Sequence, residues 1–113
     1  MSEQDRLTQV LKIIDLVDYQ DDAIVSRTLV KQKAGSVTVF AFDKGQELSA
    51  HTVPFDAWVH LLDGSGRFTV DDQPHQLGTG DSLLMPADHP HSVKATDRFK
   101  MVLSMVKSDP SES

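Results

Sequence analysis

The sequence predicts an all-β protein, and three observations lead to this fold class. After Tyr19, short runs of β-branched and aromatic residues alternate with turn residues at close intervals, which is typical of β-sandwiches and barrels. No stretch between Tyr19 and Ser108 is long enough for the crossover helix that a parallel sheet requires. The chain has 113 residues, 39% hydrophobic and 25% charged, which is the size and composition of one globular domain.

The first 18 residues form a segment of different character. Their apolar residues recur at helical spacing, at Leu7, Val10, Leu11, Ile14 and Val17. The spacing predicts a short amphipathic helix over roughly residues 3 to 14; the alternative is that residues 13–16 already begin a strand. Residues 19–107 then form the β domain, and the polar residues 108–113 are expected to be a flexible tail.

Glycine and proline mark the connections between the predicted strands. Gly64 and Gly66 bracket a predicted tight turn that needs a positive φ, and Gly78 and Gly80 mark another. Pro86 ends a strand because it cannot donate to the hydrogen-bond ladder. The predicted strands are residues 23–30, 36–42, 57–62, 67–70, 75–77, 82–85, 91–95 and 99–107.

Two of these strands, 36–42 and 57–62, carry apolar residues on both faces. A sheet that is buried on one side only should alternate apolar with polar residues, so the second face must be covered. The cover is either the N-terminal segment or a second copy of the chain. We expect a homodimer, with an interface built from the residues assigned to the outer face, Trp58, Leu62, Phe40 and Phe42.

Composition excludes several classes of function. The absence of cysteine excludes disulfides, thiolate zinc sites and cysteine nucleophiles. The net charge of -6 disfavours nucleic acid as a partner, because phosphate binding relies on an excess of lysine and arginine. No apolar run approaches the ~20 residues of a membrane span, and the N-terminus does not read as a signal peptide. A cytoplasmic location is expected.

Two segments carry a resemblance to the cupin family. Residues 45–64 read GQELSAHTVPFDAWVHLLDG and resemble the first cupin motif, G-x5-H-x-H-x3/4-E-x6-G. Residues 80–95 read GDSLLMPADHPHSVKA and resemble the second, G-x5-P-x-G-x2-H-x3-N, with Gly80, Pro86 and His91 in register and Asp88 and Ala95 as departures. The resemblance implies a double-stranded β-helix, or jelly-roll barrel. It is nearest to the small single-domain, RmlC-like bacterial cupins of unassigned function.

The resemblance also implies where a metal would bind. Its four ligand positions fall on His51, Val53, Ala57 and His91, of which only the two histidines can coordinate. His89 is the nearest third ligand, and a strand bulge would be needed to turn Asp56 inward. No cofactor is therefore required, although a divalent metal (Zn, Ni, Fe or Mn) at low occupancy is compatible with two histidines.

The same positions predict a largely apolar pocket in the barrel for a small organic ligand. Its lining is expected to be His51, Val53, Ala57, Val59, Met85, His91 and Val93. The two histidines could also act as an acid–base pair. The alternatives are a metal-dependent oxygenase or isomerase that uses His51, His91 and His89, and a structural protein with a vestigial pocket. For His60 and His75 a structural role is expected, and for Met85, Met101 and Met105 a place in the core.

Overall fold

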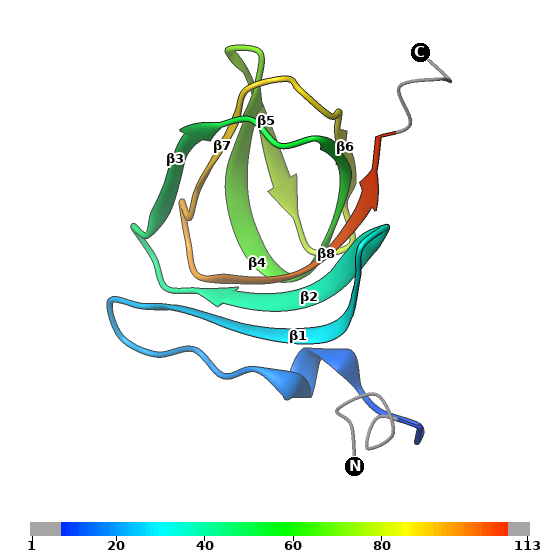
Figure 1. The fold of residues 1–113 in the computed structure, drawn as a ribbon. Helices are drawn as coiled ribbons and strands as arrows, with labels where there is room; N and C mark the ends of the chain where they lie inside the picture. The colour runs from blue at the N-terminus through cyan, green and yellow to red at the C-terminus, as the bar shows by residue number, and fades with distance from the viewer. Residues whose placement is uncertain (1–7, 109–113) are drawn as a thin grey trace.

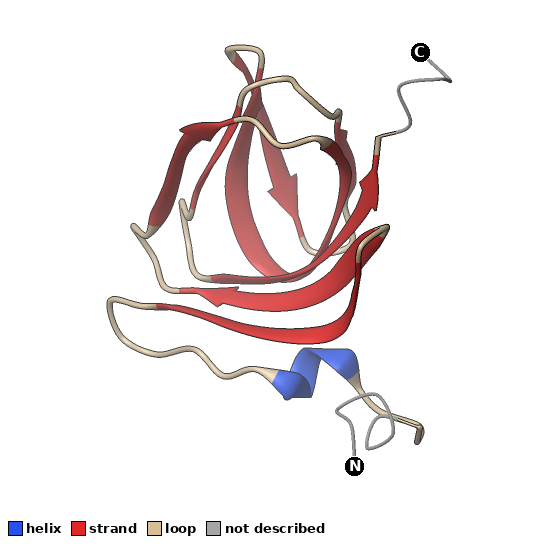
Figure 2. Ribbon diagram, viewed as in Figure 1, coloured by secondary structure: helices blue, strands red, loops and turns tan. Residues whose placement is uncertain are grey.

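The computed structural model describes residues 8–108, and they form an antiparallel β-barrel. Figure 2 shows strands throughout, with a single helical turn near the N-terminus. The elements are the 3₁₀ turn Ile13–Leu16, β1 Ile24–Gln32, β2 Gly35–Phe42, β3 Glu47–His51, β4 Phe55–Val70, β5 Gln73–Gly78, β6 Ser82–Met85, β7 His91–Lys94 and β8 Phe99–Lys107. Within residues 8–108 no helix is long and apolar enough to cross a membrane.

The strands form one sheet that curls round on itself (Figure 1). Its order is β1-β2-β8-β4-β7-β3, and β5 and β6 also pair with β4. Six of the eight predicted strands are confirmed individually. The other two, residues 57–62 and 67–70, are parts of one strand, β4, and β3 was not predicted. The antiparallel pairing of neighbours distant in the chain, such as β2 with β8, closes the barrel. The all-β, jelly-roll fold class is therefore correct.

β4 shows that the predicted turn at Gly64 and Gly66 is wrong. The chain does not reverse there; it continues as one 16-residue strand whose first part pairs with β6 and β8 and whose second part pairs with β5 and β7. Gly64 does have a positive φ, of 85°, and a Cβ atom on it would lie 1.8 Å from the carbonyl oxygen of Arg98. The two glycines thus let β4 bend closely past the chain at Arg98 and Phe99.

β3 was missed as a strand because its residues show no alternation of apolar and polar side chains. Four of its five residues are exposed. What holds it in the sheet is pairing with β7, some forty residues further along the chain, with His51 opposite His91. Val53 lies past the end of β3, so His51 and Val53 do not share a strand.

The barrel interior is filled by one apolar cluster. Its centre includes three aromatic rings, Phe42, Phe68 and Phe99, all fully buried. Phe42 and Phe99 stack with their ring centroids 4.6 Å apart, and Phe40 packs against the same cluster. The assignment of Phe40 and Phe42 to the outer face is therefore wrong. Phe40 and Phe42 do share one face of β2, as the alternation predicted, but this face points to the barrel interior.

The other face of β2 is covered by the N-terminal segment, which we call the strap (residues 13–19). Val17 of the strap, Val39 and Ala41 form a second buried cluster, against which Ile13 and Leu62 pack. Figure 1 shows this segment lying beneath β1 and β2.

The helix predicted over residues 3–14 is replaced by the 3₁₀ turn at Ile13–Leu16. Residues 8–12 are not helical, and residues 3–7 lie outside the described part of the chain, as do residues 109–113 of the predicted tail. The physical reason lies in the packing: Ile13 and Val17 contact the sheet, whereas Val10 and Leu11 are exposed and gain nothing from a helical face.

Candidate functional site

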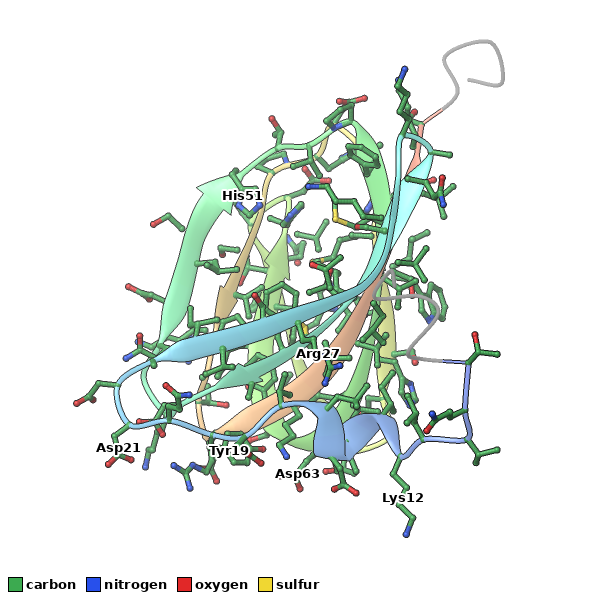
Figure 3. All side chains as sticks on the ribbon, turned by 60° about the horizontal axis from the view of Figure 1, so that its bottom comes forward. Lys12, Tyr19, Asp21, Arg27, His51 and Asp63 are labelled. Carbon is green, nitrogen blue, oxygen red and sulfur yellow. The ribbon has the colours of Figure 1, made fainter. Side chains whose placement is uncertain are left out.

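The structure brings His51 and His91 together. His51 ends β3, His91 begins β7, and the two residues are paired across the strands. Their ring centroids are 4.4 Å apart, and the rings meet edge to face at 68°. Figure 3 places His51 at one end of the barrel, far from Tyr19 and Asp63 at the other. The sequence motifs therefore located a real pair of side chains.

The hydrogen bond of His51 decides which of its ring nitrogens is free. Nδ1 lies 2.9 Å from the carbonyl oxygen of Ser49. A carbonyl can only accept, so Nδ1 carries the proton in this contact. In a neutral ring Nε2 then has a lone pair, and the exposed ring presents it as an acceptor.

His91 differs from His51 because it is buried, with 5% of its surface exposed. Its Nδ1 atom has no hydrogen-bond partner among residues 8–108. Burial, and then the nearby His51, lower the pKa of His91 below its usual value of 6.5, while a contact with the backbone of His89 acts the other way. His91 is thus a neutral imidazole at neutral pH, and its buried Nδ1 atom has no hydrogen bond of good geometry within residues 8–108.

Beneath the pair, the predicted pocket residues other than Val53 lie in the packed core. Ala57, Val59, Met85 and Val93 are all at most 3% exposed and belong to one cluster. Val53 is half-buried at the rim, where its carbonyl accepts a hydrogen bond from the backbone N–H of Asp88. The accessible part of the candidate site is therefore the end of the barrel at His51 rather than its interior.

The third metal ligand considered from the sequence does not point at the pair. The Nδ1 atom of His89 lies 2.6 Å from a carboxylate oxygen of Asp71, and the side chains are about half exposed. Asp56 accepts a hydrogen bond from the backbone N–H of Ala87, 2.9 Å away. Residues 8–108 hold no group of three or more histidine and carboxylate side chains that could bind a metal. Two imidazoles do not fit the three or more donors of a resident metal centre.

Three aspartates lie in the turns at this end of the barrel. The backbone of Asp71 donates to Pro90, and the backbone of Asp88 donates to Val53, which places both beside the histidine pair. Asp71, Asp72 and Asp88 all have positive φ angles, between 50° and 65°, in the turns of the rim. A rim of this charge attracts cations and disfavours anions.

The remaining two histidines lie outside the site. His60 is on the outer face, where its Nδ1 atom is 2.8 Å from the hydroxyl of Ser82. His75 is exposed on β5. His60 lies on the same side of β4 as Trp58 and is exposed.

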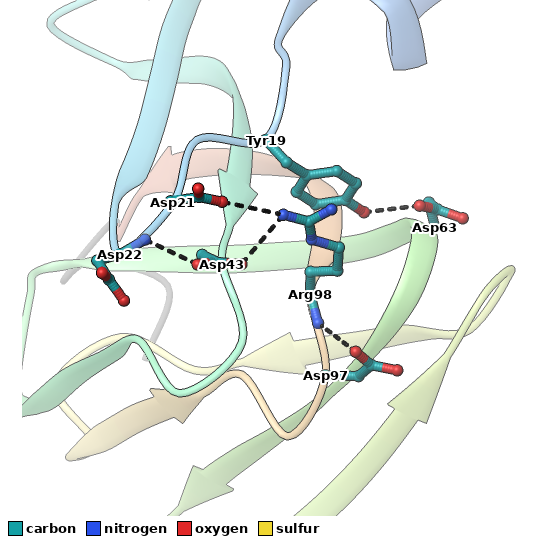
Figure 4. A network of polar contacts seen from close by, with 7 residues as sticks. All are labelled: Tyr19, Asp21, Asp22, Asp43, Asp63, Asp97 and Arg98. Carbon is teal, nitrogen blue, oxygen red and sulfur yellow. Dashed lines mark hydrogen bonds and ion pairs between the residues drawn. The ribbon is translucent and has the colours of Figure 1, made fainter.

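A polar network at the opposite end was not predicted (Figure 4). The hydroxyl of Tyr19 donates to Asp63 at 2.6 Å, and the guanidinium of Arg98 lies over the Tyr19 ring, 4.6 Å from its centroid. Arg98 also pairs with Asp43 at 3.3 Å. Burial, and then the bond to Asp63, raise the pKa of Tyr19. No sequence signal could show this network, because its members are brought together only by the strap and the sheet.

Comparison with known proteins places the chain among barrels of this kind. Residues 38–107 match the family described as cupin domain. A Streptococcus pyogenes protein of unknown function, SPY1581, is 37% identical with a TM-score of 0.86, each chain being covered to 90%. A cupin 2 conserved barrel domain protein from Leptotrichia buccalis is 42% identical with a TM-score of 0.81, over 83% of this chain and 46% of that one.

One curated relative is also similar. The protein SchB from Streptomyces halstedii is 31% identical over 75 residues, which are 66% of this chain and 54% of SchB. This chain therefore spans about half the length of that relative.

Proposed function

The chain belongs to the cupin family, and we propose that its barrel binds a small, uncharged, hydroxyl-bearing organic molecule at the end where His51 and His91 meet. The observation that carries the proposal is the buried Nδ1 atom of His91, which lacks a partner among residues 8–108. Buried polar atoms are normally hydrogen-bonded, so an unused one beside an accessible imidazole indicates a place for a ligand atom.

The chemical class of the ligand follows from charge and hydrogen-bonding capacity. A lowered pKa keeps His91 neutral, so the pair offers no fixed positive charge to an acid. The carboxylates of Asp71 and Asp88 at the rim would repel an anion further. A hydroxyl group both donates and accepts, which suits a free His51 Nε2 lone pair and either tautomer of His91.

A metal-dependent oxygenase or isomerase is the alternative function. It would need a third donor beside the two histidines, yet Val53 and Ala57 have none and His89 is turned toward Asp71. The donor set of residues 8–108 thus favours ligand binding over metal chemistry.

The test is ligand binding followed at the histidines. Monosaccharides and cyclic polyols are compared with the matching sugar acids, by thermal shift and by NMR of the imidazole nitrogens. A hydroxyl compound at ten times its Kd should raise the melting temperature by several degrees, since it adds ~1.4 kcal/mol to stability. His51→Ala and His91→Gln should lose this effect, whereas His75→Gln, an exposed control, should keep it.

Two results would contradict the proposal. One is a panel in which no uncharged compound changes the His91 imidazole signals. The other is elemental analysis of protein purified without a histidine tag that finds stoichiometric metal, lost in both His51→Ala and His91→Ala. The second result would establish the metal-dependent alternative.

A further inference from the structure

Two cationic side chains lie opposite each other on the outside of the barrel, where β3, β7 and the second part of β4 run side by side (Figure 1). Arg67 on β4 is paired directly with Lys94 on β7. Arg67 precedes the buried Phe68 on its strand, so its exposed side chain points away from the interior. Lys94 follows the buried Val93 and points outward for the same reason.

The charges of this pair are not neutralised by neighbouring side chains. Neither Arg67 nor Lys94 forms an ion pair with a carboxylate of residues 8–108. Glu47 on β3 is opposite Lys94, but it is one carboxylate beside two cations. Like charges directly opposite each other on antiparallel strands destabilise the sheet. A bound anion would remove this repulsion.

The two cations line a hollow of about 310 Å³ in this outer face. Three hydroxyl groups line it as well, those of Ser49, Thr69 and Ser92. Thr69 is paired with Ser92 and lies two residues from Arg67 along β4, so these hydroxyls share the outward face with the cations. Small-molecule pockets measure about 300–1,000 Å³, so the hollow has room for a small ligand.

We propose that this hollow binds a phosphate group, either as the free ion or as part of a small phosphorylated molecule. A guanidinium offers two parallel N–H donors to phosphate oxygens, and an ammonium adds a compact positive charge. Hydroxyl groups can donate to the remaining oxygens. A phosphate monoester carries about 1.5 to 2 negative charges at pH 7 and has three acceptor oxygens. It therefore uses both cations and the hydroxyls together, whereas a carboxylate has only two oxygens and one charge.

The net charge of -6 does not prevent an anion from binding here. At physiological ionic strength, charges more than about 8 Å away are largely screened. The residues that line the hollow then set the local potential, and among them two are cationic and Glu47 is anionic. Asp71, two residues after Thr69, bonds instead to the Nδ1 atom of His89, 2.6 Å away. The local charge of the hollow is therefore positive.

The hollow and the histidine pair lie on opposite faces of the same strands. His91 is two residues before Val93 on β7, and both side chains are buried on the interior side. Ser92 and Lys94 alternate with them and point outward into the hollow. A phosphate group in the hollow would thus be bound in addition to the uncharged ligand proposed for the histidines.

Titration with inorganic phosphate tests the site, followed by NMR of the backbone amides at constant ionic strength. Saturable shifts are expected around residues 47–50, 67–69 and 92–94. Arg67→Gln and Lys94→Gln should each weaken binding about tenfold or more, with unchanged far-UV circular dichroism, because each removes a charge-assisted hydrogen bond.

Two further variants make the test specific to charge in the hollow. Glu47→Gln should strengthen phosphate binding roughly two- to fivefold, because it removes the anion beside the site. A merely structural role of the cations would not produce this gain. The matched control is Lys31→Gln, an exposed lysine of β1 outside the hollow, which should bind phosphate as the wild type does.

Methyl phosphate distinguishes the two sources of the group. Equal or tighter binding of this monoester would assign the hollow to a phosphorylated molecule, and weaker binding would assign it to the free ion. Three outcomes would overturn the proposal: no saturable shift up to tens of millimolar phosphate, binding that survives in both Arg67→Gln and Lys94→Gln, or acetate that binds as tightly as phosphate.

Discussion

The two histidines of the candidate site show how position alone separates two chemically identical side chains. His51 is exposed and held by the carbonyl of Ser49, whereas His91, paired opposite it, is buried with Nδ1 unused. Desolvation penalises the charged form of His91, and a second imidazole 4.4 Å away adds to the effect. The pair therefore contains one ring suited to meeting solvent or ligand and one kept neutral.

The lowered pKa of His91 predicts a pH-dependent stability. In the unfolded chain this group has its usual pKa of 6.5, so below that pH the unfolded state binds more protons than the folded state. The contribution of His91 to the stability of the fold is therefore fully present above pH 6.5, and it is lost as the pH falls toward the pKa of His91 in the folded state. His91→Gln should flatten the dependence of the melting temperature on pH over this window. Equal slopes in wild type and His91→Gln, with exposed His75→Gln as the control, would contradict it.

At the scale of elements, β4 organises the barrel, because it pairs with four other strands. Its continuity depends on the conformation at Gly64, where a side chain would meet the carbonyl of Arg98. Gly45 has a nearly identical φ of 87°, but a Cβ atom there would meet nothing within 4 Å. A comparison of Gly45 with Gly64 therefore separates the cost of a left-handed backbone from the cost of a steric clash.

This contrast predicts the effects of two alanine substitutions. Gly45→Ala adds only the cost of a left-handed backbone, about 1–2 kcal/mol in the free energy of unfolding. Gly64→Ala carries the same cost and must also push two segments of backbone apart, so we expect a loss of several kcal/mol or no soluble protein. Urea denaturation of both variants, with soluble yield as a second measure, would refute this if the losses were equal.

The strands were largely readable from the sequence, for a local reason. Alternation of apolar residues, and the turn residues between the runs, are properties of neighbouring positions. This located β1, β2, β5, β6, β7 and β8 nearly as they are. β3 has no such pattern and forms a strand because it pairs with β7. In β4 the glycines predicted a turn, but glycine also permits a bend within a continuous strand.

For the whole molecule, the strap forms an additional layer outside the barrel. It covers Val39 and Ala41 and is held by Tyr19, whose hydroxyl bonds to Asp63 and whose ring lies under Arg98. A further bond joins the Lys100 ammonium to the carbonyl of Ile14 at 2.9 Å. The strap thus closes the face of the sheet opposite the main core.

Two substitutions at Tyr19 should separate the contribution of its hydroxyl to stability from the contribution of its ring. Tyr19→Phe removes only the hydrogen bond to a charged partner, which should cost about 1.5–3 kcal/mol in unfolding free energy. Tyr19→Ala also removes the ring and its contact with Arg98, so it should cost more and expose the strap to protease cleavage near residue 20. Chemical denaturation and limited proteolysis measure the two effects, and a Tyr19→Ala variant no less stable than Tyr19→Phe would show that the ring does not hold the strap.

The sequence by itself predicted the class of fold and the positions of most strands, and its motifs indicated the family and marked His51 and His91 as residues of one site. Each of these rests on local patterns or on motif residues whose spacing is preserved. The tertiary structure alone decided that Phe40 and Phe42 face inward, that the strap covers the outer side of β2, and that His89 turns to Asp71. These features depend on where the curled sheet closes and which face it then presents. Strand pairs far apart in the chain set that closure, from Val70 with His91 to Gly35 with Val106.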